Sequence, residues 1–198
     1  MKQIKDFKNV QGYSEYKALP KGAYVLKIMQ AVPGNNDFNS WIEVSFDIAE
    51  GEYKDFYMQD WKNQTGEDKK WRGTYRLYET KDDGSEQDMW RARTLKTFTT
   101  ALEESNAGYH WDWDESKWKG LFVGGLFRNE QYQKNDGTIG NTVRMSRATT
   151  VECVRTGDYR LPNDRLVEAS ASTANTTVPG INAFVDVVAD DSEELPFK

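Results

Sequence analysis

Residues 40–50 read SWIEVSFDIAE and carry the clearest structural signal in the chain. Apolar and mostly polar side chains alternate here with a period of two. The positions of one set are Ile42, Val44, Phe46 and Ile48, and those of the other are Trp41, Glu43, Ser45 and Asp47. Successive side chains of a β-strand point to opposite faces of the sheet, so the first set should face the core and the second should face solvent.

Other segments on either side of this one have a strand-like composition. Turn signals separate several of them, namely Pro33-Gly34-Asn35-Asn36 and the hairpin motif Asn135-Asp136-Gly137. Two adjacent glycines at 124 and 125 indicate a bulge or a sharp bend. The predicted strands cover residues 22–32, 40–50, 53–61, 71–79, 120–132 and 142–155.

Residues 89–105 change to a helical period. Leu95, Phe98 and Leu102 recur on one face of an amphipathic helix, and Asn106 with Gly108 supplies a stop signal. Residues 109–119 are expected to hold a further short turn of helix, capped by the aspartate at 112 or at 114.

The order of these elements predicts the fold. It runs strand, strand, strand with an extra hairpin arm, helix, strand, strand, which is the order of the OB-fold, a five-stranded Greek-key barrel. We therefore expect a mainly β chain with one helix. Residues 1–168 would form an OB-like domain with an N-terminal arm, and 169–198 a flexible linker with a disordered acidic tail. An α+β sheet with a helix on one face is the alternative.

The chain has 198 residues with one cysteine and one histidine. A single cysteine excludes a disulfide within the chain and suits a reducing compartment. This residue, Cys153, is expected to be a small buried apolar side chain. The first ten residues lack the apolar run of a signal peptide, and no stretch approaches the ~20 apolar residues that span a bilayer. These features predict a cytoplasmic protein.

Common enzyme motifs are missing, including the phosphate-binding GxxxxGK[ST], GxSxG and HExxH. We expect no catalytic residues and no cofactor. The acids at 112, 114 and 115 beside His110 resemble ligands for a hard cation, but they also suit a helix N-terminus, and we expect no metal. A metal-dependent nuclease stays open, because carboxylates can converge from distant segments.

Charge is distributed unevenly along the chain. The net charge is -6, and residues 169–198 contribute -4 of it, through five acids against Lys198 alone. The remaining part of the chain is close to neutral. Six lysines lie within residues 1–27, and residues 89–102 contain three basic residues and no acid. A nearly neutral domain of this kind can still present a basic groove.

Proteins that bind single-stranded DNA combine cations for the phosphates with rings on which bases stack. Residues 61–78 interleave the two types most densely. The predicted DNA-binding residues are Trp41, Trp61, Lys62, Lys69, Lys70, Trp71, Arg72, Tyr75, Arg76, Tyr78, Arg128, Tyr132, Lys134 and Arg144. Two alternatives stay open: Trp71 and Tyr75 could belong to the core, and a neighbouring hairpin could cover Trp41. Arg147 falls on the inward register.

Four short stretches resemble a family of small proteins encoded in replication modules of phages and prophages of Gram-positive bacteria. They are residues 21–28 (KGAYVLKI), 46–51 (FDIAEG), 109–114 (YHWDWD) and 119–124 (KGLFVG). The likeness extends over about residues 15–165. Some members of the family are regarded as single-strand DNA-binding proteins, so the resemblance implies sequence-independent DNA binding in phage replication or recombination, inside the infected bacterial host.

The C-terminal segment resembles the acidic tip of bacterial single-strand DNA-binding proteins. In those proteins, acids followed by an aliphatic residue, Pro and Phe dock on replication and repair partners. The implied partner-binding residues are Asp190, Asp191, Glu193, Glu194, Leu195, Pro196 and Phe197. Lys198 follows the Phe here, which puts in doubt any contact made through a terminal carboxylate.

Two hypotheses follow, and neither involves catalysis. The leading one is a single-stranded DNA-binding protein whose tail recruits replication or recombination partners. The other is an adaptor of a phage replisome or recombination module that touches DNA weakly or not at all, which suits the near-neutral domain. Exposed barrel edges can pair, so a homodimer is also conceivable.

Overall fold

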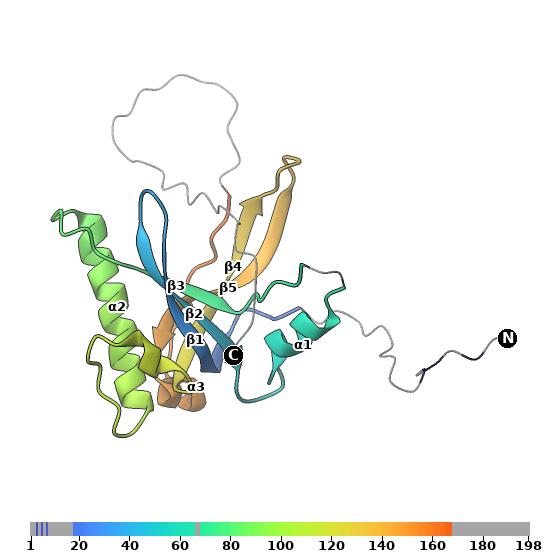
Figure 1. Ribbon diagram of the computed structural model, residues 1–198, viewed down its shortest axis with the longest axis horizontal. Coiled ribbons are helices and arrows are strands. Elements are labelled where there is room, and N and C mark those ends of the chain that lie inside the picture. The colour runs from blue at the N-terminus through green and yellow to red at the C-terminus, as the bar shows by residue number, and fades with distance from the viewer. Residues whose placement is uncertain (1–2, 4, 6, 8–17, 66–67, 168–198) are drawn as a thin grey trace, which may run out of the picture.

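A computed structural model describes residues 3, 5, 7, 18–65 and 68–167 of the chain (Figure 1). Five antiparallel strands form one open sheet in the order β3-β2-β1-β4-β5. The strands are β1 (Ala23–Asn35), β2 (Ser40–Ile48), β3 (Thr74–Tyr78), β4 (Phe122–Gln133) and β5 (Ile139–Thr149). The helices are α1 (Phe56–Asn63), α2 (Glu86–Ser105), the 3₁₀ turn η2 (Glu115–Trp118) and α3 (Val151–Thr156).

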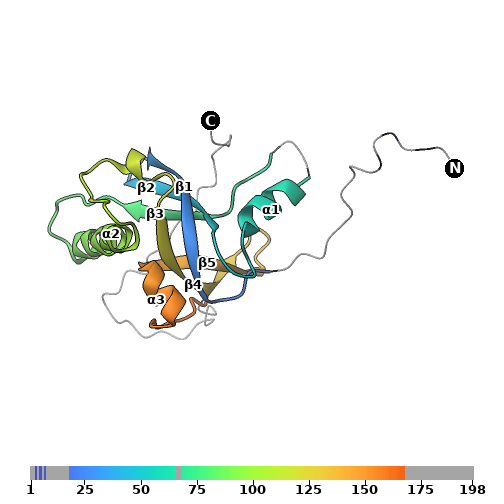
Figure 2. The ribbon, with the colours of Figure 1, turned by 90° about the horizontal axis from the view of Figure 1, so that it is seen from below.

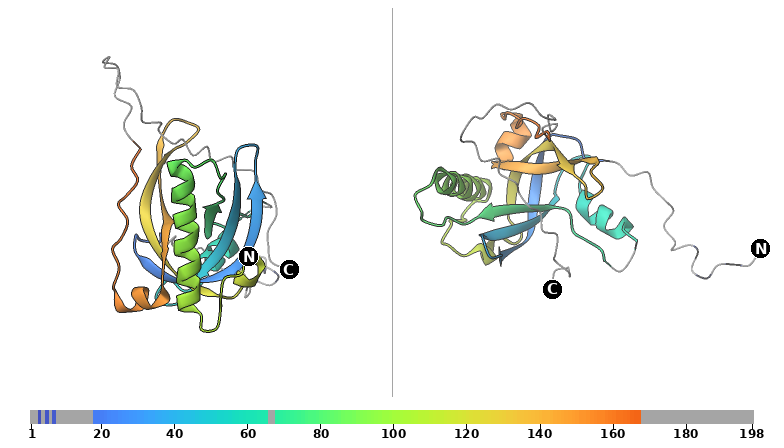
Figure 3. Two further views of the ribbon diagram at one scale, coloured as in Figure 1. Left: turned by 90° about the vertical axis from the view of Figure 1, so that its left-hand side faces the viewer. Right: turned by 90° about the horizontal axis from the view of Figure 1, so that it is seen from above.

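Two long hairpins extend beyond the centre of the sheet. β1 pairs with β4 only through residues 23–27, whereas it pairs with β2 as far as Asn35. The far half of β4 pairs instead with β5 and, at one bridge, with Arg165. The tips of the β1–β2 and β4–β5 hairpins therefore point the same way in Figures 1 and 3.

The predicted alternation within residues 40–50 is confirmed for its apolar set only. Ser45 and Asp47, expected to face solvent, are 7 % and 5 % exposed, and α1 begins over Asp47. Ile42, Val44, Phe46 and Ile48 all lie in the core, where burial of their apolar surface stabilises the fold. α2 covers this core from one side and η2 closes part of it, so that Phe98 of α2 packs against Trp118 of η2 with ring centroids 5.1 Å apart. Figure 2 shows α2 and α1 on opposite sides of the strands.

α2 confirms the predicted amphipathic helix and begins three residues before the predicted start. The side chain of Ser85 accepts a hydrogen bond from the main-chain N–H of Asp88 and caps the first turn. At the other end, the Asn106 side chain bonds both Leu102 and Phe122, which ties the helix to β4. Asp114 caps η2, as one of the two predicted caps.

The predicted strand over residues 53–61 is wrong, and with it the extra hairpin arm. The segment forms α1, in which Tyr57 and Trp61 are four residues apart on one face towards the core. The carboxylate of Asp47 accepts hydrogen bonds from the main-chain N–H groups of Tyr57 and Met58, at 2.9 and 3.0 Å. A side chain of the neighbouring strand β2 thus accepts hydrogen bonds from the N–H groups that the first turn of the helix leaves unpaired.

The predicted last strand ends earlier than expected. β5 stops at Thr149, and the side chain of Thr150 caps α3 by accepting a hydrogen bond from the N–H of Cys153 at 3.1 Å. Cys153 is half-buried on this short helix instead of fully buried on a strand. β-Branched residues at 149–151 gave the segment its strand-like composition, whereas the cap decides its structure.

The two edge strands of the open sheet approach each other at one point. The Tyr75 hydroxyl of β3 donates a hydrogen bond of 3.5 Å to the Ser146 carbonyl oxygen of β5. None of the helices within the described residues is both long and apolar enough to span a lipid bilayer. The predicted domain boundary at 168/169, the acidic tail and most of the N-terminal arm lie outside the described residues.

Candidate nucleic-acid interface

Three of the predicted residues meet on the outer face of β2 and β3. The strand register pairs Trp41 with Tyr78 and Glu43 with Arg76. The Trp41 and Tyr78 rings are 6.0 Å apart, and the guanidinium of Arg76 lies 4.8 Å from the Trp41 ring centroid. We call Trp41, Arg76 and Tyr78 the outer cluster.

The outer cluster is half-buried and held by its neighbours. Glu43 accepts a hydrogen bond of 2.8 Å from Nε of Arg76, which keeps the guanidinium over the Trp41 ring. Gly34 of β1 lies beside this ring, because a Cβ at that position would be only 2.7 Å from the indole nitrogen. Trp41 is therefore neither a core residue nor a freely exposed one.

Only one end of this strand face is open. Asp47 lies on the same side of β2 as Trp41 but is only 5 % exposed, because α1 begins over it. Burial raises the pKa of Asp47 above its ordinary value, although three main-chain N–H groups oppose the shift. The accessible part of the face thus lies near the tip of the β1–β2 hairpin.

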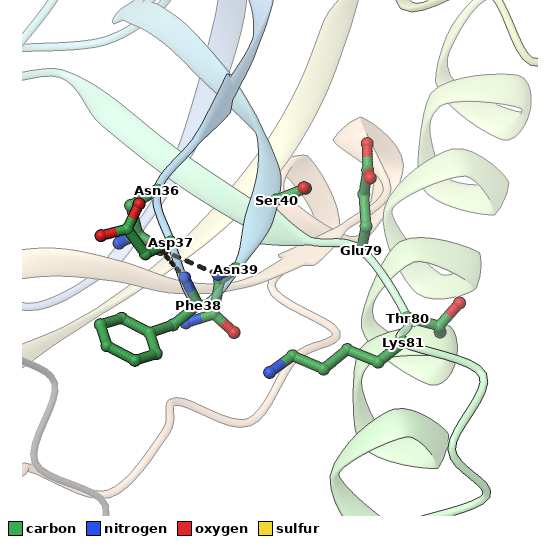
Figure 4. Close-up of a pocket in the computed structure, with 8 residues that line it drawn as sticks. All are labelled: Asn36, Asp37, Phe38, Asn39, Ser40, Glu79, Thr80 and Lys81. Atoms are coloured by element: carbon green, nitrogen blue, oxygen red, sulfur yellow. Dashed lines mark hydrogen bonds between the residues drawn. The ribbon is translucent and has the colours of Figure 1, made fainter.

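A hollow of about 350 Å³ adjoins that tip, between residues 36–40 and residues 79–81 (Figure 4). The side-chain oxygen of Asn36 accepts hydrogen bonds from the main-chain N–H groups of Phe38 and Asn39, at 3.0 and 2.8 Å. This turn presents the Phe38 ring to solvent with 76 % of its surface exposed. On the other side, Lys81 extends towards the turn (Figure 4).

Arg91 of α2 connects the residues that line the hollow with the outer cluster. Its guanidinium donates to the Glu79 carbonyl oxygen at 2.9 Å and to the Asn39 side chain at 2.6 Å, and it lies 5.6 Å from the Tyr78 ring centroid. The side chain is almost completely buried. One cation therefore positions the hairpin tip, the end of β3 and the outer cluster relative to one another.

Trp71 and Tyr75 do not belong to this surface, which corrects their prediction as ring platforms. Trp71 is 8 % exposed, and its indole N–H lies 3.2 Å from the Phe46 carbonyl oxygen and 3.1 Å from that of Gly73. The Tyr75 ring stacks on Phe98 in the core, and burial raises its pKa to about 12. Neither ring has a face free for a base.

A second group of predicted residues surrounds the end of α1. The Lys69 ammonium lies 5.0 Å from the Trp61 ring centroid, and Arg72 pairs with Asp60 at 3.3 Å. Lys62 and Lys70 are exposed on the same segment. Within the described residues this group makes no ion pair or ring contact with the outer cluster, and α1 packs on β2 at the opposite end from Trp41.

The third group lies on the β4–β5 hairpin. Arg128 faces Arg144 across the strands and pairs with Glu130 at 2.7 Å, whereas Arg144 and Lys134 are exposed. Tyr132 is also exposed and packs over Gly140. Arg147, predicted to point inwards, is exposed, because a β-bulge at Ser146 shifts the alternation of β5.

Sequence reasoning missed Phe38, Arg91 and the cap role of Asp47. An aromatic residue among Asn36, Asp37 and Asn39 in a turn was a usable signal, since turns lie at the surface. Arg91 gave no such signal, because its buried contacts come from three separate elements.

The sequence matches no protein-family model and no curated protein. Among the described residues, no three His, Cys, Asp or Glu side chains come together as metal ligands do. The outer cluster, the hollow beside it and the exposed cations of the β4–β5 hairpin are therefore the features from which a function is argued.

Proposed function

We propose that this chain binds single-stranded DNA without sequence preference and performs no catalysis. Bases would lie on the outer face of β2 and β3, and the two long hairpins would contact the strand on either side. The observation that carries the proposal is the position of the outer cluster, because the face of strands 2 and 3 is where OB-folds bind oligonucleotides.

The strand order supports an OB-like barrel. An OB-fold needs the order β3-β2-β1-β4-β5 with its two edges joined, and a helix between the third and fourth strands. The chain has that order, and α2 follows β3. The Tyr75–Ser146 hydrogen bond lies between the strands that would have to meet.

The outer cluster suits stacking on a strand of any sequence. Every base has a π-face, so stacking on Trp41 or Tyr78 requires no base identity. Arg76 can leave the Trp41 ring for a phosphate at small cost, because an ion pair as exposed as Arg76–Glu43 contributes only about 0–1 kcal/mol. The same movement would free a ring face for a base.

We further propose that residues 190–197 recruit replication or recombination proteins, in keeping with a phage replication role. The sequence supplies four acids followed by Leu, Pro and Phe, a combination that fits a basic, apolar pocket on a partner.

An adaptor that binds other proteins is the second candidate function. It is favoured by the ion pairs that several of the predicted DNA-binding cations form with acids of this chain. Arg76, Arg128 and Arg72 each bind an acid of this chain. Paired cations attract phosphates less than free ones do, so a surface of this kind also suits a polar protein partner.

Anisotropy of a labelled oligo-dT, titrated with the full chain at low and at moderate salt, separates the two candidates. DNA binding predicts saturable binding at low salt, with an affinity that falls by a slope of about 0.7 per phosphate contact in a log–log plot. A flat signal at high protein concentration would favour the adaptor. Shortening of the oligonucleotide in Mg²⁺ or Mn²⁺ would instead reveal a nuclease.

A further inference from the structure

The side of α2 that faces away from the sheet carries an unusual combination of residues. Met89 and Trp90 are 53 % and 60 % exposed, and Arg93 and Lys96 are exposed beside them. Residues three and four apart share one face of a helix, so the four side chains form one surface, which we call the α2 stripe. The left view of Figure 3 looks onto this side of the helix.

The cations of the α2 stripe differ from those of the outer cluster. Arg93 and Lys96 form no ion pair with another described residue, whereas Arg76 is bound to Glu43. Met89 and Trp90 are adjacent in the chain and both more than half exposed, so they form one apolar contact rimmed by polar side chains, which is the arrangement typical of an interaction site. The stripe therefore offers two available positive charges beside an apolar contact.

We propose that the α2 stripe binds the acidic C-terminal segment of the same chain, residues 190–197. The segment has four acids and then Leu195 and Phe197, so it complements the stripe in both charge and apolar character. Its carboxylates pair with Arg93 and Lys96, and Phe197 packs on Trp90.

The length of chain between the two partners permits this contact. Val167 is the last described residue, and residues 168–189 separate it from Asp190. These 22 residues span at most about 75 Å when fully extended, which exceeds the roughly 40 Å across a domain of about 150 residues. The closed contact needs no second copy of the chain.

The contact has a regulatory consequence. The acidic segment would be held on α2 and away from the outer cluster, where it would otherwise compete with phosphates. A partner that binds residues 190–197 must first displace them from the stripe. This inference is independent of the proposed DNA binding, because it concerns only two parts of one chain.

Photo-cross-linking of the full chain tests the proposal directly. The variant Phe197→benzoylphenylalanine is irradiated without DNA, and the adducts are mapped by mass spectrometry. We expect adducts within residues 89–96, formed within one chain at a yield that does not depend on protein concentration. Charge reversal by R93E/K96E should lower that yield about fivefold or more, since each exposed ion pair contributes up to about 1 kcal/mol.

The double variant K54E/K119E is the matched control, because it makes the same change of charge at two other exposed lysines. Its yield should equal that of the unmodified chain. Adducts on the β2–β3 face, adducts only between chains, or an R93E/K96E yield equal to the control would each overturn the proposal. Loss of oligo-dT binding in R93E/K96E with unchanged cross-linking would assign the stripe to DNA and overturn it as well.

Discussion

Trp41 lies where its ring can pack against neighbouring residues and could also stack on a bound base. Gly34 leaves room for its ring on one side, and the guanidinium of Arg76 covers it at 4.8 Å. The cation can leave without opening the core, because the core side chains of β2 point to the other face of the sheet. If Trp41 stacks on a base as proposed, its ring is therefore pre-positioned at little cost in stability.

Replacing Trp41 by leucine should weaken oligo-dT binding. Loss of one stacked base costs about 1–3 kcal/mol, which corresponds to about 5- to 150-fold in affinity. Titration of a labelled oligonucleotide measures the change. W113L is the matched control, because Trp113 is an exposed tryptophan outside the outer cluster. Equal affinities of the two variants would place the DNA elsewhere.

Asp47 should make stability depend on pH. Burial raises its pKa in the folded protein above the ordinary 3.8. The folded state therefore holds the proton more tightly than the unfolded chain does, and the stability contributed by Asp47 falls as pH rises through this range. The free energy of unfolding of the wild type minus that of D47N should decrease as pH increases above about 4.

Urea unfolding of both proteins at several pH values provides the measurement. Taking the difference removes the surface carboxylates, which titrate equally in the two proteins. The amide introduced by D47N retains one oxygen to accept from the helix N–H groups, so the variant should fold. A difference that stays constant or increases with pH would contradict the burial of a charge-bearing Asp47.

At the scale of an element, the packing of α1 against β2 depends on the absence of a side chain at Gly73. This glycine connects the segment after α1 to β3, and a Cβ there would lie 2.3 Å from the Phe46 carbonyl oxygen and 2.7 Å from the Tyr57 ring. G73A should therefore destabilise the protein by about 1–3 kcal/mol, measured by urea unfolding. G22A is the control, because its Cβ would come no nearer than 3.2 Å to another atom, the Tyr24 hydroxyl oxygen. Unchanged stability of G73A would mean that α1 does not pack on β2 as described.

The β4–β5 hairpin should contribute to DNA binding through its positive charges. Lys134 and Arg144 are exposed on it and form no ion pair with another described residue. If each contacts one phosphate, K134Q/R144Q should reduce the slope of log affinity against log salt by about 1.4. K54Q/K119Q should leave the slope unchanged. An unaltered slope in K134Q/R144Q would remove this hairpin from the DNA contact.

Elements with a clean period could be predicted from the sequence, and those decided by distant partners could not. The alternation of residues 40–50 and the helical spacing of Leu95, Phe98 and Leu102 both correspond to observed elements. α1 was missed because its aromatic residues suit either a strand or a helix. The decisive hydrogen bonds come from Asp47, which precedes the helix by nine residues.

The candidate site was predictable in part for the same reason. Alternation placed Trp41, Arg76 and Tyr78 on outward positions, and the strand register brings these three together. Trp71 could not be assigned, because its burial depends on hydrogen bonds to two carbonyl oxygens that only the folded chain brings near. Arg147 was misplaced because a bulge reverses the alternation beyond it.

The molecule as a whole presents two separate surfaces. The outer cluster with its adjoining hollow would take DNA, and the α2 stripe would take the acidic segment of the same chain. Arg91 lies between them, since it belongs to α2 and contacts Tyr78 and the hairpin tip. The two activities are therefore expected to be separable by substitutions in the outer cluster and in the α2 stripe.

The central claim is that a single strand lies on the β2–β3 face. Ultraviolet cross-linking of the full chain to unmodified oligo-dT, with the adducts mapped by mass spectrometry, tests it most directly. We predict adducts at Trp41, at Tyr78 or at Phe38 beside the hollow. Adducts confined to α1 or α2, or none at saturating oligonucleotide, would contradict it.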